Sequence, residues 1–310
     1  MNLNIVFMGS PEFAVPALQK LATFSNVVGV VTQPDRPAGR GRILTSPPVK
    51  NLAQELGIPV IQPVRLKDEG VFEILQAWKP DLIIVAAFGQ ILRQNVLDLP
   101  RFGCINVHAS LLPRWRGAAP IQAAILHGDT QTGVTIMKMD TGIDTGSMLA
   151  QRIEPIHSQD TPLTLSPRLA NMGAELLIDT LPGYVAGEII PQEQDEKQST
   201  YAPMLKKEDG KLDFNQPAIE LEQKVRAFYP WPGCFMKIDD ETIKVIKSHV
   251  VEKNVEPAGT RLVINGLPAI ATGKDVLAMD VLQPAGKKVI AGDDFLRGYR
   301  NWTTQKSLKR

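Results

Sequence analysis

The chain has 310 residues, of which 44% are hydrophobic and 22% charged, and 34 Lys and Arg nearly balance 33 Asp and Glu to give a formal net charge of +1. This composition is typical of a two-domain globular protein and excludes a strongly basic or acidic chain. The two cysteines are too few for a disulfide framework or a Cys-rich zinc site.

The sequence carries no signal for a membrane or for export. Its longest apolar run, residues 82–88, is much shorter than the roughly 20 residues that cross a bilayer. The N-terminus has neither the charged region nor the cleavage site of a signal peptide. We therefore expect a soluble, cytoplasmic protein without membrane contact. We also expect a monomer, because no apolar seam is evident.

The first half of the chain alternates between strand and helix patterns. Apolar runs predict buried strands at Leu3–Phe7, Val27–Thr32, Leu82–Ala87, Gly133–Met137 and, with Asn106 interrupting, Ile105–Val107. Amphipathic patterns predict helices at Phe13–Ala22, Val49–Leu56, Val71–Trp78, Ile121–His127 and Thr164–Leu181. Pro167 should lie in the first turn of the last helix. This alternation predicts an α/β fold with a doubly wound, mostly parallel sheet.

The second half has a different pattern. We expect a first domain over residues 1–187, a polar, acidic linker over 188–204 and a second domain over 205–310. In the second domain, short strand-like segments separated by Gly, Pro, Asn and Asp predict a small β-domain, either a sandwich or a barrel. Residues 205–310 carry 18 Lys and Arg against 14 Asp and Glu, a net charge of +4. A polyphosphate partner and a solvated charged surface both account for that excess.

A polar pair interrupts one of the predicted buried strands. Asn106 and His108 are two residues apart, so both side chains point to the same face of the strand. Polar side chains in an apolar strand are costly unless they are satisfied, and ligands bind at the carboxyl ends of strands in open α/β sheets. The pair marks either a functional site or a strand end that caps the next loop. Cys104 lies too far along the strand to form a nucleophile pair with His108, so we expect a buried structural cysteine.

The loop MDTGIDTG after the last predicted strand holds two carboxylates, Asp140 and Asp144. Gly142 and Gly146 should allow unusual backbone angles there. The loop either brings a carboxylate to a neighbouring strand end or forms a turn in which the Asp side chains bind their own backbone.

A second loop, residues 33–48, is long, glycine-rich and basic, with Arg36, Arg40 and Arg42. Arginine binds phosphate through paired donors, so the loop suits a phosphate-rich substrate, although an exposed flexible loop explains the same composition.

Several familiar site types have no counterpart in the sequence. It lacks a GxGxxG fingerprint after the first strand, a Walker A motif and a GxSxG elbow. Without the GxGxxG fingerprint we predict no dinucleotide cofactor. The four histidines have no metal-ligand spacing, so we also predict no metal.

Two segments carry a resemblance to a known family: Ile105–Gln122 (INVHASLLPRWRGAAPIQ) and Gly133–Leu149 (GVTIMKMDTGIDTGSML). The Asn-x-His strand end, the SLLP loop and the later Asp resemble the folate-dependent formyltransferases. Further segments are similar to the branch of that family that formylates methionyl-tRNA: Val31–Gly41, Thr200–Phe214, Arg226–Gly233 and Leu282–Lys288. The likeness covers nearly the whole chain.

The resemblance implies a Rossmann-like formyltransferase core followed by an OB-like β-barrel. It implies an enzyme of translation initiation that moves a formyl group from 10-formyltetrahydrofolate to the α-amine of methionyl initiator tRNA. Folate would contact Ser110, Leu111, Leu112, Pro113, Phe88, Gly89, Gln90, Ile91, Leu92 and Asp140. The tRNA would meet Arg36, Arg40, Arg42, Lys287 and Lys288.

This reaction builds a tetrahedral centre that bears a developing oxyanion, which positioned N–H donors stabilise. We expect Asn106 and His108 to supply those donors and Asp144 to complete a proton relay, through His108 or through a water. The alternatives are a formyltransferase for a purine precursor or an amino-sugar nucleotide, a formylfolate hydrolase, and a folate- or RNA-binding protein without activity.

Overall fold

The computed structural model describes residues 3–38, 41, 43–238, 241–299 and 301–303. The chain divides into two compact units. The N-terminal unit comprises Met1–Pro120, Gln131–Pro155 and Ser166–Ala202, and the C-terminal unit comprises Ile121–Thr130, Ile156–Leu165 and Pro203–Arg310. Two short segments that interrupt the N-terminal unit in the sequence therefore pack with the second unit.

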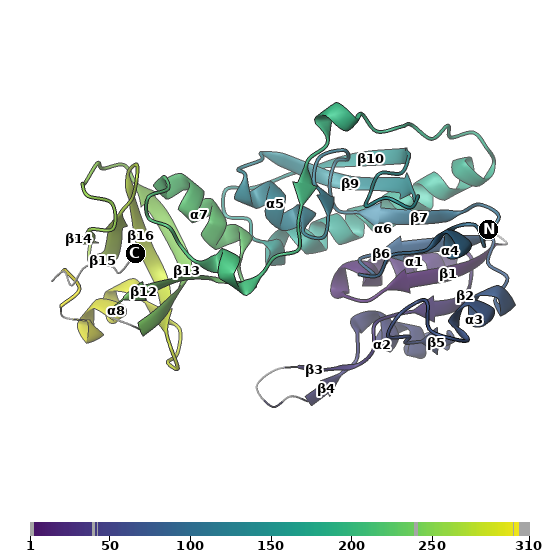
Figure 1. Ribbon diagram of the computed structural model, residues 1–310, viewed down its shortest axis with the longest axis horizontal. Coiled ribbons are helices and arrows are strands. Elements are labelled where there is room, and N and C mark those ends of the chain that lie inside the picture. The colour runs from purple at the N-terminus through teal and green to yellow at the C-terminus, as the bar shows by residue number, and fades with distance from the viewer. Residues whose placement is uncertain (1–2, 39–40, 42, 239–240, 300, 304–310) are drawn as a thin grey trace. The chain divides into compact units, whose positions relative to one another are not determined.

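A seven-stranded sheet forms the centre of the N-terminal unit, in the order β10-β9-β7-β6-β1-β2-β5 (Figure 1). The strands are β1 (Asn4–Gly9), β2 (Asn26–Val31), β5 (Val60–Ile61), β6 (Leu82–Ala86), β7 (Cys104–His108), β9 (Gln131–Lys138) and β10 (Met148–Pro155). Neighbours from β5 to β7 are parallel, and β9 is antiparallel to both β7 and β10. The mostly parallel sheet is confirmed, but β9, which contains Gly133–Met137, is not one of its parallel strands.

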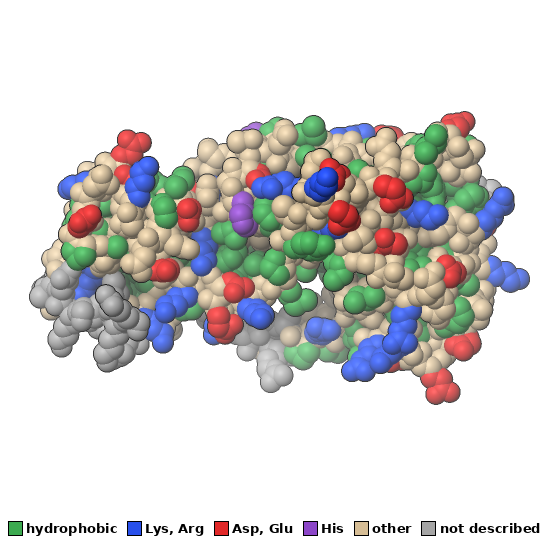
Figure 2. All heavy atoms as spheres, turned by 45° about the horizontal axis from the view of Figure 1, so that its top comes forward, with side chains coloured by type: hydrophobic (Ala, Val, Ile, Leu, Met, Phe, Trp, Pro, Cys, Tyr) green, Lys and Arg blue, Asp and Glu red, His purple; other side chains and the backbone are tan. Residues whose placement is uncertain are grey.

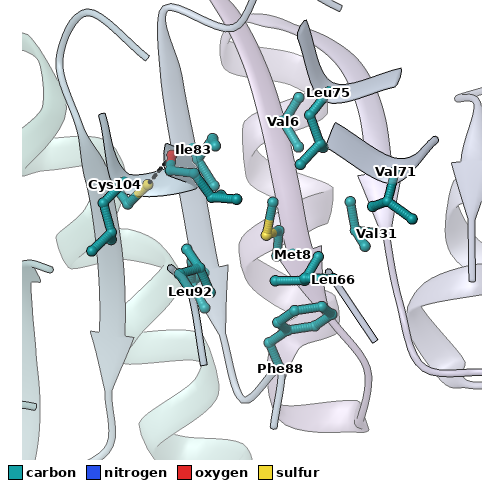
Figure 3. Packing of buried hydrophobic residues seen from close by; sticks show 13 residues of the cluster. Val6, Met8, Val31, Leu66, Val71, Leu75, Ile83, Phe88, Leu92 and Cys104 are labelled. Carbon is teal, nitrogen blue, oxygen red and sulfur yellow. Dashed lines mark hydrogen bonds between the residues drawn. The ribbon is translucent and has the colours of Figure 1, made fainter. Parts of the chain in front are cut away.

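Helices cover both faces of this sheet, as a doubly wound fold requires. They are α1 (Val15–Phe24), α2 (Pro48–Glu55), α3 (Val71–Ala77), α4 (Gln94–Leu97) and α6 (Pro162–Val185), and a 3-10 turn η1 (Glu12–Ala14) precedes α1. Helix α5 (Pro120–Leu126) belongs, apart from its first residue, to the C-terminal unit. On one face, α3 and α4 contribute to a buried cluster that contains Met8, Ile83 and Cys104 (Figure 3). On the other face, a Cβ at Gly173 of α6 would lie 2.8 Å from Val107, so the missing side chain allows close approach.

Further features of the N-terminal unit differ from the sequence-based expectation. Helix α6 begins two residues earlier than predicted, so Pro167 lies in its second turn rather than its first. Strand β10 was not predicted at all. It is one of the two edge strands of the sheet, and β5 at the other edge was not predicted either. Exposed residues alternate with partly buried ones along the second half of β10, so it lacks the continuous apolar run that marks a buried strand.

The basic loop and the acidic stretch both contain regular structure. In the basic loop, β3 (Arg36–Ala38) and β4 (Ile43–Thr45) pair as an antiparallel hairpin that extends away from the sheet (Figure 1). In the acidic stretch, a 3-10 turn η2 (Glu196–Gln198) precedes β11 (Tyr201–Ala202), and β11 pairs in parallel with β8 (Arg116–Gly117). Residues up to Ala202, expected as linker, are therefore fastened to the N-terminal unit.

The C-terminal unit is built on an antiparallel sheet in the order β12-β13-β16-β15-β14, with β17 paired to β16. Its elements are η3 (Lys207–Gly210), α7 (Ala218–Ala227), β12 (Cys234–Ile238), β13 (Glu241–Val251), β14 (Arg261–Ile264), β15 (Leu267–Ala271), β16 (Val276–Pro284), β17 (Ile290–Ala291) and α8 (Gly292–Gly298). The buried Phe295 of α8 stacks on Tyr299. The expected change from an α/β to a β architecture is confirmed. No helix within the described residues is long and apolar enough to cross a bilayer.

Candidate active site

Asn106 and His108 lie at the carboxyl end of β7, and both are buried. Asn106 is paired with Val85 of β6 and with Met137 of β9, and His108 is paired with Thr135. Because β6 and β7 are parallel, the loops that follow them leave the same edge of the sheet. In an open α/β sheet that edge is where ligands bind.

The carboxylate of Asp144 meets this pair. Its Oδ1 accepts a hydrogen bond from Nδ2 of Asn106 at 3.3 Å, and its Oδ2 lies 3.5 Å from Nδ1 of His108. The backbone N–H of Gly117 also donates to Oδ2, at 2.8 Å. Asp144 itself has a φ of +53°, a left-handed conformation that is uncommon outside glycine. Asp144 is therefore in contact with both of the other side chains expected to carry the chemistry.

The second nitrogen of His108 is also engaged. Nε2 lies 2.9 Å from the carbonyl oxygen of Trp115. A carbonyl oxygen can only accept, so Nε2 carries the hydrogen, and Nδ1 is the nitrogen that faces Asp144. This arrangement differs from our expectation that His108 offers an N–H to the oxyanion, because both ring nitrogens already have partners.

The two carboxylates of the MDTGIDTG loop have different partners: Asp140 binds within the loop, and Asp144 contacts the end of β7. Oδ1 of Asp140 accepts from the N–H of Gly142 at 3.0 Å and from the hydroxyl of Thr145 at 2.7 Å, so this side chain builds the turn. Asp144 instead reaches the strand end. Asp140 was expected to contact folate, and in the structure it is exposed and binds its own loop.

The loop glycines have a different purpose from the one expected. Positive φ angles occur at Asp144 and not at Gly142 or Gly146. A Cβ at Gly142 would lie 2.0 Å from Oγ1 of Thr145, and one at Gly146 would lie 1.8 Å from the carbonyl oxygen of Lys138. Both positions therefore need glycine for space rather than for backbone freedom.

Sequence reasoning missed a polar network around the buried Arg116, beside these residues. Arg116 is completely buried, and its Nε donates to Oε1 of Gln194 at 2.9 Å. Its two terminal nitrogens pair with both carboxylate oxygens of Glu196 at 3.0 and 2.8 Å. These hydrogen bonds hold the pKa of Glu196 below its usual range. Arg116 and Gln194 follow no pattern in the sequence that marks them as buried.

The SLLP loop is held rigidly by its own polar atoms. The Ser110 hydroxyl donates to the carbonyl of Arg114 at 2.6 Å, and the Ser110 carbonyl accepts from Thr135 at 2.6 Å. The N–H of Leu112 donates to Oγ1 of Thr135 at 3.1 Å. The side chains of Ser110 and Leu112 are buried, whereas Leu111 and Pro113 are half-buried and remain accessible.

The Phe88–Leu92 loop follows β6 and divides into anchors and surface residues. Phe88 and Leu92 belong to the buried cluster seen in Figure 3. Oε1 of Gln90 accepts from the N–H of Leu66 at 2.9 Å, which fastens the middle of the loop. Gly89 has a φ of +78°, and Ile91 is 75% exposed. Only the backbone near Gly89 and the Ile91 side chain are free to face a ligand.

Comparison with known proteins decides the family. A formyl transferase model matches residues 3–181, and a formyl transferase C-terminal domain model matches residues 204–300. The methionyl-tRNA formyltransferase of Halorhodospira halophila is 49% identical over 97% of this chain and 97% of its own. That of Myxococcus xanthus is 47% identical over 96% and 95%. The chain belongs to the methionyl-tRNA formyltransferase family.

Solved structures agree on the fold of this formyltransferase family. An N-formyltransferase of Helicobacter canadensis, solved with folinic acid and dTDP-3-aminofucose, gives a TM-score of 0.64 at 19% identity over 89% of this chain and 99% of that one. The methionyl-tRNA formyltransferase of Clostridium thermocellum gives 0.54 at 17% identity over 94% and 100%. The family assignment confirms the resemblance drawn from the sequence motifs: the chain is a one-carbon transferase that uses a folate-type formyl donor.

The basic residues expected to meet the tRNA substrate of this formyltransferase lie in both units. Arg36 of β3 is exposed and donates to Oε1 of Gln33 at 3.2 Å, whereas Arg40 and Arg42 lie outside the described residues. Lys287 and Lys288 lie in the exposed turn after β16. Over the face seen in Figure 2, basic and acidic side chains are interspersed, in keeping with the net charge of +1.

The two thiols of this formyltransferase take no part in the site. Cys104 and Cys234 are both buried, and burial raises the pKa of each thiol to about 12. A thiol with such a pKa is almost entirely protonated at neutral pH and is a poor nucleophile. Among the described residues, no group of three or more His, Cys, Asp and Glu side chains is placed to hold a metal ion.

Proposed function

We propose that the chain transfers the formyl group of 10-formyltetrahydrofolate to the α-amine of methionyl initiator tRNA in the cytoplasm, and that Asn106, His108 and Asp144 perform the transfer. The observation that carries this proposal is the contact of Asp144 with both Asn106 and His108 at the carboxyl end of β7. Three polar groups gathered at the ligand-binding edge of an α/β sheet suit acyl transfer.

The formyl donor would lie where the strand order reverses. The chain passes from β1 outward to β2 and β5, then returns to the other side of β1 as β6 and β7. The switch point therefore lies between β1 and β6, and the Phe88–Leu92 loop leaves the sheet there. Gly89 and Ile91 of that loop, with Leu111 and Pro113 of the SLLP loop, would contact the folate next to Asn106.

Asn106 would stabilise the oxyanion. Its amide nitrogen has two N–H groups, of which one donates to Asp144. The second is available for the oxygen of the formyl group as the tetrahedral centre forms. One such donor typically contributes 10²–10³ in rate. The hydrogen bond to Asp144 fixes the direction of the amide before the substrate arrives.

His108 and Asp144 would handle the proton. The α-amine attacks the formyl carbon, loses a proton, and the folate nitrogen that leaves gains one, so the reaction needs a group that holds a proton between the two steps. Nδ1 of His108 faces Asp144, and an imidazolium formed there is stabilised by the carboxylate. Its positive charge also favours the nearby oxyanion. Neither step needs a covalent enzyme intermediate.

The acceptor would be recognised through its phosphates. Arg36, Arg40 and Arg42 of the N-terminal unit, with Lys287 and Lys288 of the C-terminal unit, would contact the tRNA backbone. Arg is suited to phosphate because its planar guanidinium donates two parallel hydrogen bonds. Such contacts carry affinity and position, while they leave sequence recognition to other groups.

The test is a formylation assay with purified protein, 10-formyltetrahydrofolate and charged initiator tRNA. Charged elongator methionyl-tRNA, a dTDP-amino sugar and a reaction without acceptor serve as the three controls. We expect formylation of the initiator tRNA and little reaction in the controls. Preferential formylation of the amino sugar, or release of formate without an acceptor, would instead show a sugar formyltransferase or a formylfolate hydrolase.

A further inference from the structure

We infer that Gln194 is a positioning residue for the formyl transfer, and that it holds the Asp144 carboxylate against Asn106 and His108 from a buried site that Arg116 and Glu196 maintain. The inference rests on the proposed function, because it assigns a role through Asp144. It goes beyond that function by giving the acidic stretch at the end of the N-terminal unit a part in the chemistry.

Gln194 binds the backbone of the MDTGIDTG loop through its side-chain amide. Its Nε2 donates to the carbonyl oxygens of Asp144 and Gly146, each at 2.8 Å. The two carbonyls flank the residue that follows Asp144, so one amide group fixes the backbone on both sides of it. Asp144 is in the left-handed conformation, which L-amino acids adopt only when the surroundings favour it. The two hydrogen bonds supply that support.

Arg116 fixes the orientation of the Gln194 amide. Oε1 of Gln194 accepts from Nε of Arg116 at 2.9 Å, so the amide cannot rotate and its Nε2 must face Asp144. Arg116 is completely buried, and a buried guanidinium is tolerated only when it is paired and fully hydrogen-bonded. Glu196 meets that need through two parallel hydrogen bonds.

The same stretch also supports the other side of the site. The Thr200 hydroxyl accepts from the N–H of Trp115 at 2.9 Å, and its carbonyl accepts from the N–H of Arg116 at 2.9 Å. The Trp115 carbonyl in turn holds His108. The segment from Gln194 to Thr200 therefore reaches both members of the proton-handling pair, Asp144 through Gln194 and His108 through Trp115.

A double-mutant cycle separates positioning from a general structural role. Gln194→Met keeps the size of the side chain and removes its donors and acceptor, and Asp144→Asn removes the charge that Gln194 is inferred to place. In single-turnover reactions with saturating substrates, we expect Gln194→Met to slow formylation about 10- to 100-fold. The KM values for tRNA and folate should change less than about 2-fold, because bound substrate is not contacted.

The decisive result is the effect of Gln194→Met in the Asp144→Asn background. If Gln194 acts through Asp144, its substitution there should cost less than about 2-fold, because the group that it places is already lost. If Gln194→Met instead slows the Asp144→Asn protein by the same factor as it slows the native protein, the inference is overturned and the proposed function stays intact. An unchanged rate for Gln194→Met in the native background would do the same. An unchanged rate for Asp144→Asn alone would overturn both.

Two further variants guard against a trivial result. Gln192 lies two residues before Gln194, is exposed, and hydrogen-bonds to Met148 through its backbone alone. The variant Gln192→Met should therefore leave the rate of formylation unchanged. Urea unfolding of every variant establishes that the rates are those of folded protein. If Gln194→Met is unfolded, the cycle starts instead from Glu196→Gln, whose side chain is 69% exposed, with the same expected coupling to Asp144→Asn.

Discussion

His108 donates from Nε2 to the carbonyl oxygen of Trp115 at 2.9 Å, and this single contact determines which ring nitrogen is available for chemistry. The carbonyl belongs to the loop that follows β7, so the strand and its own loop together fix the imidazole. Nδ1 is left facing Asp144 at 3.5 Å. The imidazole is therefore oriented before any substrate binds, by a backbone carbonyl at one ring nitrogen, with the carboxylate beside the other.

This geometry predicts the tautomer of the free enzyme. The neutral imidazole of His108 should carry its hydrogen on Nε2, because the Trp115 carbonyl can only accept. Nitrogen-15 NMR of the four histidines, with a His108→Gln variant to assign the signal, measures it directly. A neutral His108 with its hydrogen on Nδ1 would contradict the assignment of Nδ1 as the proton-exchanging nitrogen.

Gly117 should be intolerant of a side chain. Its φ is +108°, and a Cβ would lie 2.7 Å from the carbonyl oxygen of Ala202, while its N–H binds the Asp144 carboxylate. Gly117→Ala should destabilise the fold by about 1–3 kcal/mol and lower kcat, because the amide is displaced. Urea unfolding and steady-state kinetics measure the two effects.

Gly187→Ala is the matched control for that experiment. Gly187 also has a positive φ, +76°, but a Cβ there would meet nothing within 4 Å. It should cost only backbone strain, about 1–2 kcal/mol, and leave kcat unchanged. Equal losses of kcat in the two variants would show that strain alone, and not the Gly117 contact with Asp144, accounts for the effect.

The pairing of Glu196 with Arg116 predicts a pH dependence of stability. Hydrogen bonds from Arg116 lower the pKa of Glu196 from its ordinary value of 4.5. A carboxyl whose pKa is lower in the folded state stabilises the fold above its unfolded pKa, and this contribution is lost as the pH falls through the folded pKa. Glu196→Gln should therefore be less stable than the native chain at neutral pH. The difference in stability between the two proteins should disappear as the pH falls below 4.5. Thermal unfolding at a series of pH values measures this difference. A difference that persists unchanged into strong acid would refute the assignment.

Lys287 and Lys288 should contribute to tRNA binding through charge. If each contacts a phosphate, Lys287→Ala and Lys288→Ala should each flatten the plot of log affinity against log salt by about 0.7–0.9. The KM for tRNA should rise while kcat at saturation is retained. Lys253→Ala, another exposed lysine of the C-terminal unit, is the control and should not change the slope. Slopes that do not differ from the native one would remove these two lysines from the interface.

Much of the fold was predictable, because the buried strands of a doubly wound sheet have apolar runs that can be recognised in the sequence. Asn106 and His108 were predictable for a related reason: polar residues that break such a run need a partner or a purpose. Strand β10 was not, because an edge strand has no continuous apolar run, and neither was the antiparallel direction of β9, since periodicity carries no information on direction.

The supporting residues could not be predicted. Arg116 follows the SLLP loop and looks like any surface arginine, and Gln194 lies in a polar stretch without periodicity. Their burial depends on β11 pairing with β8, a contact between segments more than 80 residues apart that nothing local specifies. Likewise, the sequence offered two interpretations of the MDTGIDTG loop, and the structure assigns the turn to Asp140 and the strand end to Asp144.

The most direct test of the central claim is the rate of formyl transfer by Asp144→Asn under single-turnover conditions with initiator tRNA and 10-formyltetrahydrofolate. The substitution keeps the shape of the side chain and removes its charge, so binding and folding should be retained. We expect a loss of about 10²–10⁴ in rate, the usual contribution of a positioned proton-transfer group. Formylation within about 3-fold of the native rate by a folded Asp144→Asn protein would contradict the account, because the observed contacts of Asp144 would then have no part in the reaction.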